Sequence, residues 1–344
     1  MQEQFTGQAG LVSRTIRWGI LGSGRIARKF ASDLKYVKDS ELIAIGSRSI
    51  ESAEAFANEF PVAHKHDSYV ALVQNDEVDV IYVATPHNLH YENTLLCLNN
   101  NKAVLCEKPF AMNISQAQAM IKLAREKKLF LMEALWTKFL PHYNKTLEII
   151  RKGDLGEIKS ILVNFGFRPA PPVPKRLFDP VLGGGTIMDI GIYNIFIALS
   201  ILGKPGSIEA SMTPADTGVD EQCAVLFKYS NGALAQLFST FSSDLATDAD
   251  ISGNQGRIRL TTRFYEPSST VEFYPGRADT KREIPVDKEP GFGYQYEARH
   301  VVDCLQKELK ESPVMSHADT LLLMETLDQV RKTAGIRYAE DINA

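Results

Sequence analysis

The first third of the chain alternates short apolar runs with amphipathic segments, and this alternation restricts the possible folds more than any other feature. The run 78–84 is rich in β-branched residues and has no polar alternation, which is typical of a strand buried on both faces. Strands that alternate with helices form a parallel sheet, because each crossover returns the chain to the same edge. We therefore expect an α/β domain with a doubly wound parallel sheet. The predicted strands are 16–21, 42–47, 62–66, 78–84, 103–106 and 129–133, and the predicted helices are 25–36, 51–59, 68–74, 89–98 and 113–127.

The pattern changes near residue 139, where strands begin to follow one another directly. Asn231-Gly232 between two of these strands is a strong hairpin signal. With 344 residues the chain is long enough for two domains. We expect the parallel-sheet domain over 15–138 and an α+β domain with one large, mainly antiparallel open sheet over 139–337. The predicted strands of this second domain are 158–167, 209–213, 222–229, 233–241, 249–252, 257–262 and 270–274, and its predicted helices are 142–152, 186–202, 294–309 and 318–333.

A glycine motif lies between the first predicted strand and the first predicted helix. Gly22, Gly24 and Ala27 match G-x-G-x-x-G/A, a signal that is strong in this strand–turn–helix setting. Gly22 permits the tight turn, and Gly24 lets the backbone approach a pyrophosphate at the helix N-terminus. The motif predicts a Rossmann domain that binds a dinucleotide, and a tight turn without a ligand is the alternative. The residues of this turn expected to contact the dinucleotide are Gly22, Ser23, Gly24, Arg25 and Ile26.

The end of the second predicted strand distinguishes between the two nicotinamide cofactors. An NAD site usually has Asp or Glu there to accept hydrogen bonds from the ribose, whereas this strand ends in Ser47-Arg48-Ser49. The Arg48 guanidinium can bind a 2′-phosphate in bidentate fashion, and Ser47 can add a donor. We expect NADP rather than NAD, with a solvated surface arginine as the alternative.

Two more segments follow strands of the same predicted sheet, at the carboxyl edge where this fold binds ligands. The first, Thr85-Pro86-His87-Asn88-Leu89-His90, is expected to line the cofactor, and the start of the next helix is the alternative. In the second, Glu107-Lys108-Pro109, the lysine can donate to the nicotinamide ribose and point at the substrate. A surface lysine before a proline turn is the alternative. The expected cofactor contacts are Thr85, Pro86, Asn88, His90, Glu107 and Lys108.

Three glycines at 183–185 precede the apolar helix 186–202. They let a ligand or another backbone approach the N-terminus of that helix. Asp189 and Tyr193 are four residues apart and therefore lie on one helix face. The alternative is an Asp that interacts with the helix dipole and a Tyr that packs in the core. The proline-rich loop at 169–174 fits a lid or a plain connector equally well.

Together these motifs resemble the glucose–fructose oxidoreductase / inositol dehydrogenase / MocA (Gfo/Idh/MocA) family. The resemblance rests on residues 22–27, 107–109 and 183–193 and covers nearly the whole chain. Residues 133–139 and Tyr193 make the chain most similar to the dimeric dihydrodiol dehydrogenase branch, which also contains NADP-dependent D-xylose dehydrogenases. Much of the wider family has His at the position of Tyr193, so inositol-type substrates are less expected here.

The resemblance implies a hydride transfer between NADP and a small sugar, polyol or diol, or its carbonyl product. It implies that Lys108 and Tyr193 are catalytic, with Asp189 in support. It also implies an often cis Lys108–Pro109 bond, a place for Trp136 in the substrate pocket, and a homodimer formed through the C-terminal sheet. An NADP-binding sensor without catalytic activity is the alternative. Their position around the proline loop adds Phe167, Arg168 and Arg176 as candidates for the substrate pocket.

The proton chemistry can be considered from the residue types. A free tyrosine has a pKa of about 10, so Tyr193 cannot easily act as a base near neutral pH. An ammonium about 4 Å from a phenolate supplies on the order of 4 kcal/mol at an effective dielectric near 20, whereas burial opposes the phenolate. We expect Tyr193 as proton donor or acceptor, Lys108 as the group that tunes and orients it, and Asp189 as a hydrogen-bonding anchor.

Composition argues against other classes of partner. The net charge of −4 offers no electrostatic reason to bind nucleic acid or an anionic membrane. The four cysteines show no CxxC spacing, so we expect no disulfide scaffold, no metal site and a reducing cytoplasm. Residues 1–14 lack the apolar core of a signal peptide, and the apolar stretch 192–202 is too short to span a bilayer. We expect neither export nor a membrane anchor from these signals.

Overall fold

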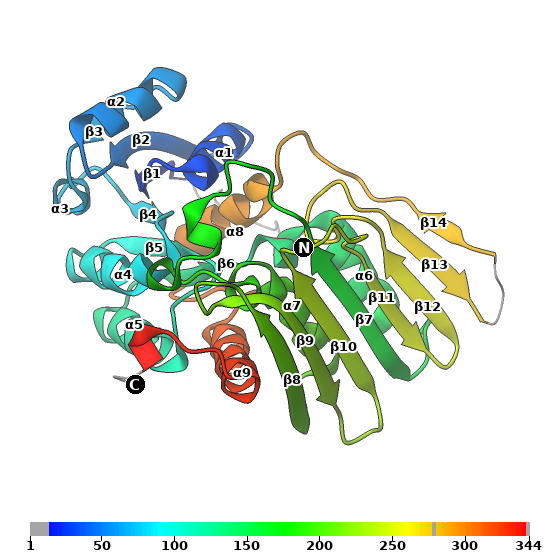
Figure 1. Ribbon diagram of the computed structural model, residues 1–344. Helices are drawn as coiled ribbons and strands as arrows, with labels where there is room; N and C mark the ends of the chain where they lie inside the picture. The colour runs from blue at the N-terminus through cyan, green and yellow to red at the C-terminus, as the bar shows by residue number, and fades with distance from the viewer. Residues whose placement is uncertain (1–13, 277–279, 342–344) are drawn as a thin grey trace, which may run out of the picture.

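The computed structural model describes residues 14–276 and 280–341, and its first unit is a parallel sheet with flanking helices (Figure 1). Within those residues this sheet has six parallel strands in the order β3-β2-β1-β4-β5-β6. The predicted Rossmann fold is therefore confirmed. The strands are β1 (Ile16–Leu21), β2 (Ser40–Gly46), β3 (His64–His66), β4 (Val80–Val83), β5 (Ala103–Glu107) and β6 (Leu131–Ala134). The helices are α1 (Arg25–Leu34), α2 (Ile50–Glu59), α3 (Tyr69–Val73), α4 (His90–Asn99) and α5 (Ile114–Lys127).

The central strands of the parallel sheet are mostly apolar because both faces of the sheet are covered there. Every residue of β4 and of β5 is buried. The strand order changes direction between β1 and β4, and in such folds the ligand binds outside the carboxyl ends of these strands. The glycine motif follows β1, and the segment beginning at Thr85 follows β4, so both lie at this position.

The second sheet, over the same described residues, has eight strands in the order β14-β13-β12-β11-β7-β10-β9-β8. Only the β7–β10 pair is parallel among its pairings, so the predicted mainly antiparallel sheet is confirmed. The three-residue strand β14 was not expected, because its short, charged sequence has no apolar alternation. The strands are β7 (Ile158–Gly166), β8 (Ser207–Pro214), β9 (Asp220–Lys228), β10 (Leu234–Thr240), β11 (Ala249–Gly253), β12 (Gly256–Leu260), β13 (Val271–Pro275) and β14 (Arg282–Ile284). The helices are α6 (Pro141–Arg151), α7 (Ile192–Leu202), α8 (Tyr294–Gln306) and α9 (His317–Ala334).

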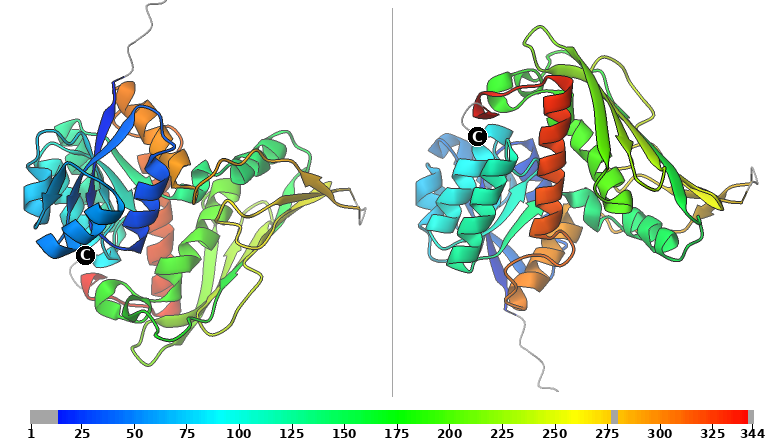
Figure 2. Two further views of the ribbon diagram at one scale, coloured as in Figure 1. Left: turned by 90° about the horizontal axis from the view of Figure 1, so that it is seen from above. Right: turned by 90° about the horizontal axis from the view of Figure 1, so that it is seen from below.

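The last two helices join the two units. In Figure 2, α9 (red) lies between the two sheets, and it contacts both α5 and β8. Helix α8 packs against α1, and the Asp33 carboxylate at the end of α1 accepts hydrogen bonds from the backbone N–H groups of Phe292 and Tyr294 at 2.9 Å. The C-terminal segments therefore return to the first unit, which periodicity alone does not reveal.

One helical run of the described chain, Pro180–Leu202, is long and apolar enough to cross a membrane by length and composition. The stretch 192–202 is thus part of a longer helical run than expected. However, 83% of its most apolar window is buried inside the molecule, as in the core helix of a globular unit. The expected helix is present, but it begins with a wide π turn, Ile187–Gly191, before α7 starts.

Candidate active site

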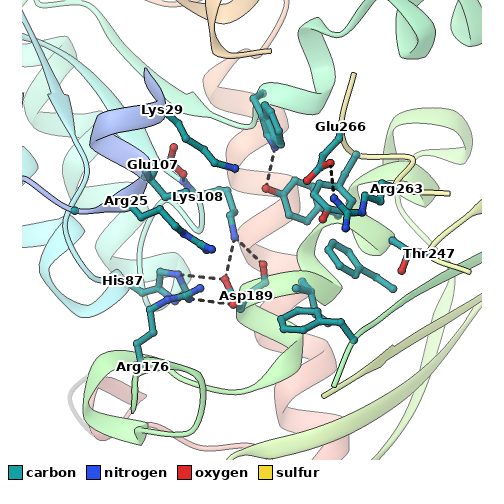
Figure 3. Close-up of a pocket in the computed structure, with 18 of the residues that line it drawn as sticks. Arg25, Lys29, His87, Glu107, Lys108, Arg176, Asp189, Thr247, Arg263 and Glu266 are labelled. Atoms are coloured by element: carbon teal, nitrogen blue, oxygen red, sulfur yellow. Dashed lines mark hydrogen bonds and ion pairs between the residues drawn. The ribbon is translucent and has the colours of Figure 1, made fainter. Parts of the chain in front are cut away.

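A cavity of about 790 Å³ lies where the carboxyl edge of the parallel sheet faces the second sheet (Figure 3). Its lining comes from the segments after β1, β4, β5 and β6 and from loops of the second unit. Both units therefore contribute to one site. The predicted site residues that line it are Gly24, Arg25, Ile26, Thr85, Pro86, His90, Glu107, Lys108, Trp136, Phe167, Arg176, Asp189 and Tyr193.

The glycine turn has the shape that a dinucleotide requires. Gly22 has a φ of +102°, and a Cβ there would lie 2.8 Å from the Ala84 carbonyl oxygen, so only glycine fits. A Cβ on Gly24 would meet no atom within 4 Å, so this position is open. Among the described residues no side chain caps the N-terminus of α1 at Gly24, and the backbone N–H groups there suit a pyrophosphate. These residues fit a nicotinamide dinucleotide.

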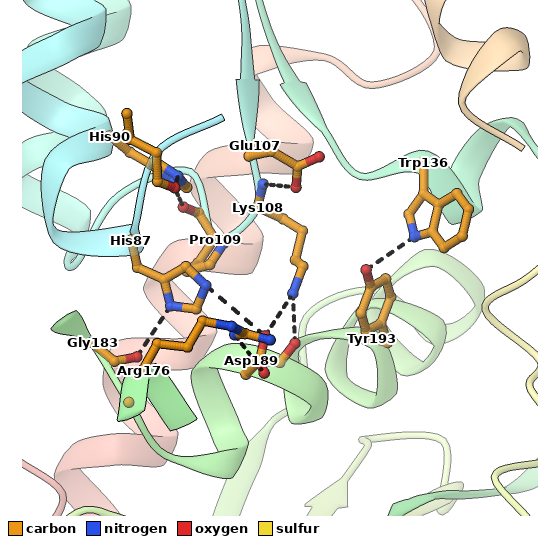
Figure 4. A network of polar contacts seen from close by, with 12 residues as sticks. His87, His90, Glu107, Lys108, Pro109, Trp136, Arg176, Gly183, Asp189 and Tyr193 are labelled. Atoms are coloured by element: carbon orange, nitrogen blue, oxygen red, sulfur yellow. Dashed lines mark hydrogen bonds and ion pairs between the residues drawn. The ribbon is translucent and has the colours of Figure 1, made fainter. Parts of the chain in front are cut away.

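Asp189 brings two cations together at the centre of the cavity (Figure 4). Lys108 Nζ donates to the Asp189 backbone oxygen at 2.6 Å and to Oδ1 at 3.3 Å, and Arg176 Nη1 donates to Oδ2 at 3.0 Å. Burial by itself would raise the pKa of Asp189, but Lys108 and Arg176 outweigh this and hold it below its ordinary value. The Lys108–Pro109 peptide bond is cis.

Tyr193 lies beside this ion cluster and is held by a different contact. Its hydroxyl accepts a hydrogen bond from Trp136 Nε1 at 3.0 Å, while Lys108 Nζ lies over the phenol ring, 5.0 Å from the centroid. Burial raises the pKa of Tyr193 well above 10, and the nearby Tyr294 and Glu107 act in the same direction. Tyr193 is therefore a neutral phenol near neutral pH. The ammonium contacts the ring face and Asp189 rather than the hydroxyl.

Two family models cover most of the chain. Residues 16–135 match the model described as oxidoreductase family, NAD-binding Rossmann fold, and residues 143–259 match the Gfo/Idh/MocA C-terminal domain. The chain belongs to the Gfo/Idh/MocA oxidoreductase family. This confirms the resemblance seen in the sequence and makes the protein an NAD(P)-dependent oxidoreductase.

Relatives of this oxidoreductase match it over nearly its full length. The trans-1,2-dihydrobenzene-1,2-diol dehydrogenase of Xenopus laevis is 36% identical over 331 residues, which are 94% of this chain and 99% of that protein. The enzyme of the same name from Homo sapiens is 33% identical over 332 residues, covering 95% and 99%. The crystal structure of a 3-ketoreductase from Actinomadura kijaniata in complex with NADP and TDP-benzene has a TM-score of 0.82 and 27% identity, covering 93% and 98%. An aldose–aldose oxidoreductase from Caulobacter crescentus, complexed with glycerol, shares the fold with a TM-score of 0.85 at 22% identity, covering 94% and 98%.

Two histidines after β4, His87 and His90, place ring nitrogens against backbone oxygens at the oxidoreductase site. His90 lines the cavity, but its ring nitrogens lie 2.7 Å from the Pro109 oxygen and 2.9 Å from the Thr85 oxygen, so they face backbone rather than open space. His87 was not selected from the sequence, although it lies in the same quoted segment. Its Nδ1 lies 3.1 Å from the Gly183 oxygen and its Nε2 lies 4.0 Å from Asp189 Oδ1. Burial lowers the pKa of His87 to about 3, so the ring is neutral.

The glycine run at 183–185 accommodates protein atoms rather than a ligand. Gly185 has a φ of +108°, and a Cβ there would collide with the buried carboxylate of Asp220. That carboxylate accepts hydrogen bonds from Thr186 Oγ1 at 2.6 Å and from the Ile187 N–H at 2.7 Å, which hold the start of the π turn. Asp220 was missed because it lies on β9, outside any motif.

Glu107 adds a buried carboxyl beside Lys108. It accepts a hydrogen bond from the Tyr82 hydroxyl, and its Oε2 accepts one from the Lys108 backbone N–H at 3.1 Å. Burial raises the pKa of Glu107 to about 7, although Tyr82 and Lys108 act to lower it. The charge of Glu107 therefore changes near neutral pH, next to Lys108, whose ammonium donates to Asp189.

Several of the predicted residues lie outside the cavity. They are Gly22, Ser23, Ser47, Arg48, Asn88 and Arg168. The hydroxyls of Ser23 and Ser47 lie 3.1 Å apart at the ends of β1 and β2. Arg48 is exposed, and no carboxylate in the described part of the chain forms an ion pair with it. Arg168 is also exposed, and its backbone N–H donates to Asp244 Oδ1 at 3.0 Å.

Most of the aromatic and polar wall of the cavity was not predicted from the sequence. Tyr294 stacks on Trp136 with ring centroids 4.6 Å apart, and Tyr265 stacks on Phe165 at 4.3 Å. Of the rings not predicted, Tyr294 begins α8, Tyr265 lies in the β12–β13 loop and Phe165 lies on β7, and none of them belongs to a recognisable motif. The other cavity residues missed by sequence reasoning include Lys29, His87, Asp244, Thr247, Arg263 and Glu266. Among the residues that the structure describes, no group of three His, Cys, Asp or Glu side chains is placed to hold a metal ion.

Proposed function

We propose that the protein is an NADP-dependent oxidoreductase that interconverts a hydroxyl group and a carbonyl group on a small sugar, polyol or diol. One observation carries the proposal: Lys108, which is distant in sequence from Asp189 and Tyr193, lines one cavity with them and with the open glycine turn. The bound nicotinamide supplies or accepts the hydride. The names of the relatives, a diol dehydrogenase and a 3-ketoreductase, support this class of reaction.

Within this proposal Tyr193 handles the proton. As a buried neutral phenol, it can donate its proton to the oxygen of a carbonyl substrate, and the Trp136 N–H orients its hydroxyl. The Lys108 ammonium then stabilises the phenolate that remains, and Asp189 keeps Lys108 in place. The raised pKa keeps Tyr193 protonated near neutral pH, which is the form that reduction requires, whereas oxidation requires its phenolate as the base.

The test is a screen of aldoses, polyols, trans-diols and their carbonyl products. Turnover is measured by the nicotinamide absorbance with NADPH, NADH and their oxidised forms. We expect turnover that is much faster with NADP(H). In Arg48→Ala, kcat/KM for NADPH should fall by roughly 10- to 100-fold and that for NADH should stay unchanged, because a charge-assisted contact to the 2′-phosphate is lost. The matched control is Arg282→Ala, which removes an exposed arginine from β14.

Two results of this screen would contradict the proposal. Turnover with NADH that equals or exceeds turnover with NADPH removes the NADP preference. Tight binding of NADPH without turnover of any compound in the screen favours the catalytically silent sensor instead.

We also propose that the protein forms a homodimer through the outer face of the second sheet. Among the described residues no helix covers this face (Figure 2), and it carries a groove of about 600 Å³ lined by residues such as Leu162, Leu226 and Phe238. Leu162 is 44% exposed, which is unusual for an apolar residue in the middle of a strand.

Light scattering should give the mass of a dimer for the wild type, and Leu162→Glu should give a monomer because it places a charge in the interface. Val70→Glu, at an exposed apolar position on α3, should remain dimeric, whereas a monomeric wild type would refute the interface.

A further inference from the structure

Two loops of the second unit build a polar wall in the cavity that the proposed chemistry does not use. The β10–β11 loop contributes Asp244 and Thr247, and the β12–β13 loop contributes Arg263 and Glu266. We call these four residues the distal wall. Figure 3 shows Thr247, Arg263 and Glu266 on the opposite side of the cavity from the α1 residue Arg25, with the central ion cluster between them. A substrate that reacts at the centre can therefore extend towards the distal wall.

The distal wall adjoins the reacting phenol through Tyr265. This residue lies between Arg263 and Glu266 in the sequence, and its ring centroid is 5.2 Å from that of Tyr193. Its backbone oxygen accepts a hydrogen bond from Thr137 Oγ1 at 3.2 Å, which ties the loop to the first unit's last segment. The backbone that carries Arg263 and Glu266 is thus held close to Tyr193.

The two loops are held in an unusual backbone conformation. Thr247 has a φ of +50° and Arg263 has a φ of +61°, and neither is glycine. A β-branched residue rarely adopts this region. The Thr247 oxygen accepts hydrogen bonds from the Arg263 N–H at 2.8 Å and from the Phe264 N–H at 3.2 Å, so the two loops fix each other. Such conformations persist where surrounding contacts enforce them, and they are concentrated at functional sites.

The chemistry of the distal wall suits hydroxyl groups. Arg263 Nη1 makes one long contact with Glu266 Oε2, at 3.4 Å, and the Arg263 side chain is 63% exposed, so most of its N–H donors are not engaged in that contact. The carboxylates of Asp244 and Glu266 line the same cavity and can accept hydrogen bonds, while the guanidinium donates them. A hydroxyl both donates and accepts, so a substrate with several hydroxyls can satisfy a wall that holds both carboxylates and a guanidinium. Because the wall holds two carboxylates and one guanidinium, its net charge is negative and disfavours a phosphate or carboxylate group.

We propose that the distal wall is the subsite that binds the hydroxyl groups beyond the reacting carbon of a neutral polyhydroxylated substrate, and that Arg263 determines this specificity. The assignment rests on the proposed function and narrows its substrate class to an aldose or polyol. A trans-diol of an aromatic ring has no further hydroxyls that could reach the distal wall, so it is a poorer substrate.

The experiment compares Arg263→Ala and Arg263→Lys with the control Arg282→Ala on substrates of two lengths, using the full chain with NADPH. The long substrates are five- and six-carbon aldoses, and the short ones are two- and three-carbon hydroxyaldehydes that cannot span the cavity. Arg263→Ala should lower kcat/KM for the long substrates by roughly 10- to 100-fold, mainly through KM. Its kcat/KM for the short substrates and its Kd for NADPH should change less than about twofold. Arg263→Lys should retain part of the preference for long over short substrates. Arg282→Ala should behave like the wild type.

Three outcomes would overturn the subsite. The first is an equal loss on long and short substrates, which indicates a structural role for Arg263. The second is a wild-type enzyme that prefers an arene trans-diol over every aldose.

The third outcome comes from a binding experiment, which tests the subsite separately from the chemistry. Of the two tryptophans, Trp18 is buried in the core and Trp136 lines the cavity, so tryptophan fluorescence reports ligand binding in the cavity. If no substrate is turned over, polyol binding that is lost in Arg263→Ala keeps the subsite while the proposed reaction fails, whereas no polyol binding overturns the subsite.

Discussion

Tyr193→Phe is expected to lower kcat by roughly 10²- to 10⁴-fold and to leave the Kd for NADPH within about twofold, because the variant lacks the proton donor but keeps the ring. The hydroxyl also accepts the hydrogen bond from Trp136 Nε1, so the variant leaves a buried donor without a partner. That loss should cost about 1–3 kcal/mol of unfolding free energy. Single-turnover kinetics, NADPH titration and urea denaturation measure these three quantities separately.

The control for this substitution is Tyr36→Phe, which removes a phenol hydroxyl from a half-exposed side chain outside the cavity. It should leave kcat and stability unchanged. Normal turnover in Tyr193→Phe would contradict the proton assignment, and a different group would then have to protonate the substrate oxygen.

Lys108→Met should lower kcat by roughly 10²-fold, because it removes a positive charge from beside the phenolate that forms during reduction. With the 5.0 Å from Lys108 Nζ to the Tyr193 ring centroid taken as the separation, and an effective dielectric near 20, this charge is worth about 3 kcal/mol. Lys108→Arg keeps the charge and should retain more activity than Lys108→Met. Lys122→Met, on the exposed surface of α5, is the matched control, and unchanged kcat in a folded Lys108→Met protein would rule out this role.

The same substitution should change the dependence of stability on pH. The pKa of Asp189 is held below its ordinary value in the folded protein, so its ionised form contributes stability at neutral pH that is lost on acidification through the folded-state pKa. Without Lys108, Arg176 is the only direct cationic partner left to Asp189 among the residues that the structure describes, and the pKa of Asp189 rises. Acid unfolding of Lys108→Met, followed by circular dichroism, should therefore begin at a higher pH than in the wild type.

Local patterns were enough to predict most of the fold. The central strands of the parallel sheet and the helices between them were found because burial on both faces leaves an apolar run, and packing on one face leaves a helical stripe. Strand β14 was missed because a three-residue edge strand has no periodicity to detect. The π turn at Ile187–Gly191 was also missed, since it arises from how Asp220 and the glycine run pack around it rather than from residue spacing.

The sequence by itself determined the fold class, the glycine turn that fits a dinucleotide, and the identity of Lys108, Asp189 and Tyr193 as candidates, because each depends on residues close together along the chain. Only the tertiary structure decided their partners. It pairs Lys108 with Asp189 and places the ammonium over the Tyr193 ring, it brings Trp136 to the phenol hydroxyl, and it adds the distal wall from two loops without a motif. Contacts between segments that are distant in sequence depend on how whole surfaces pack, and no local periodicity encodes that packing.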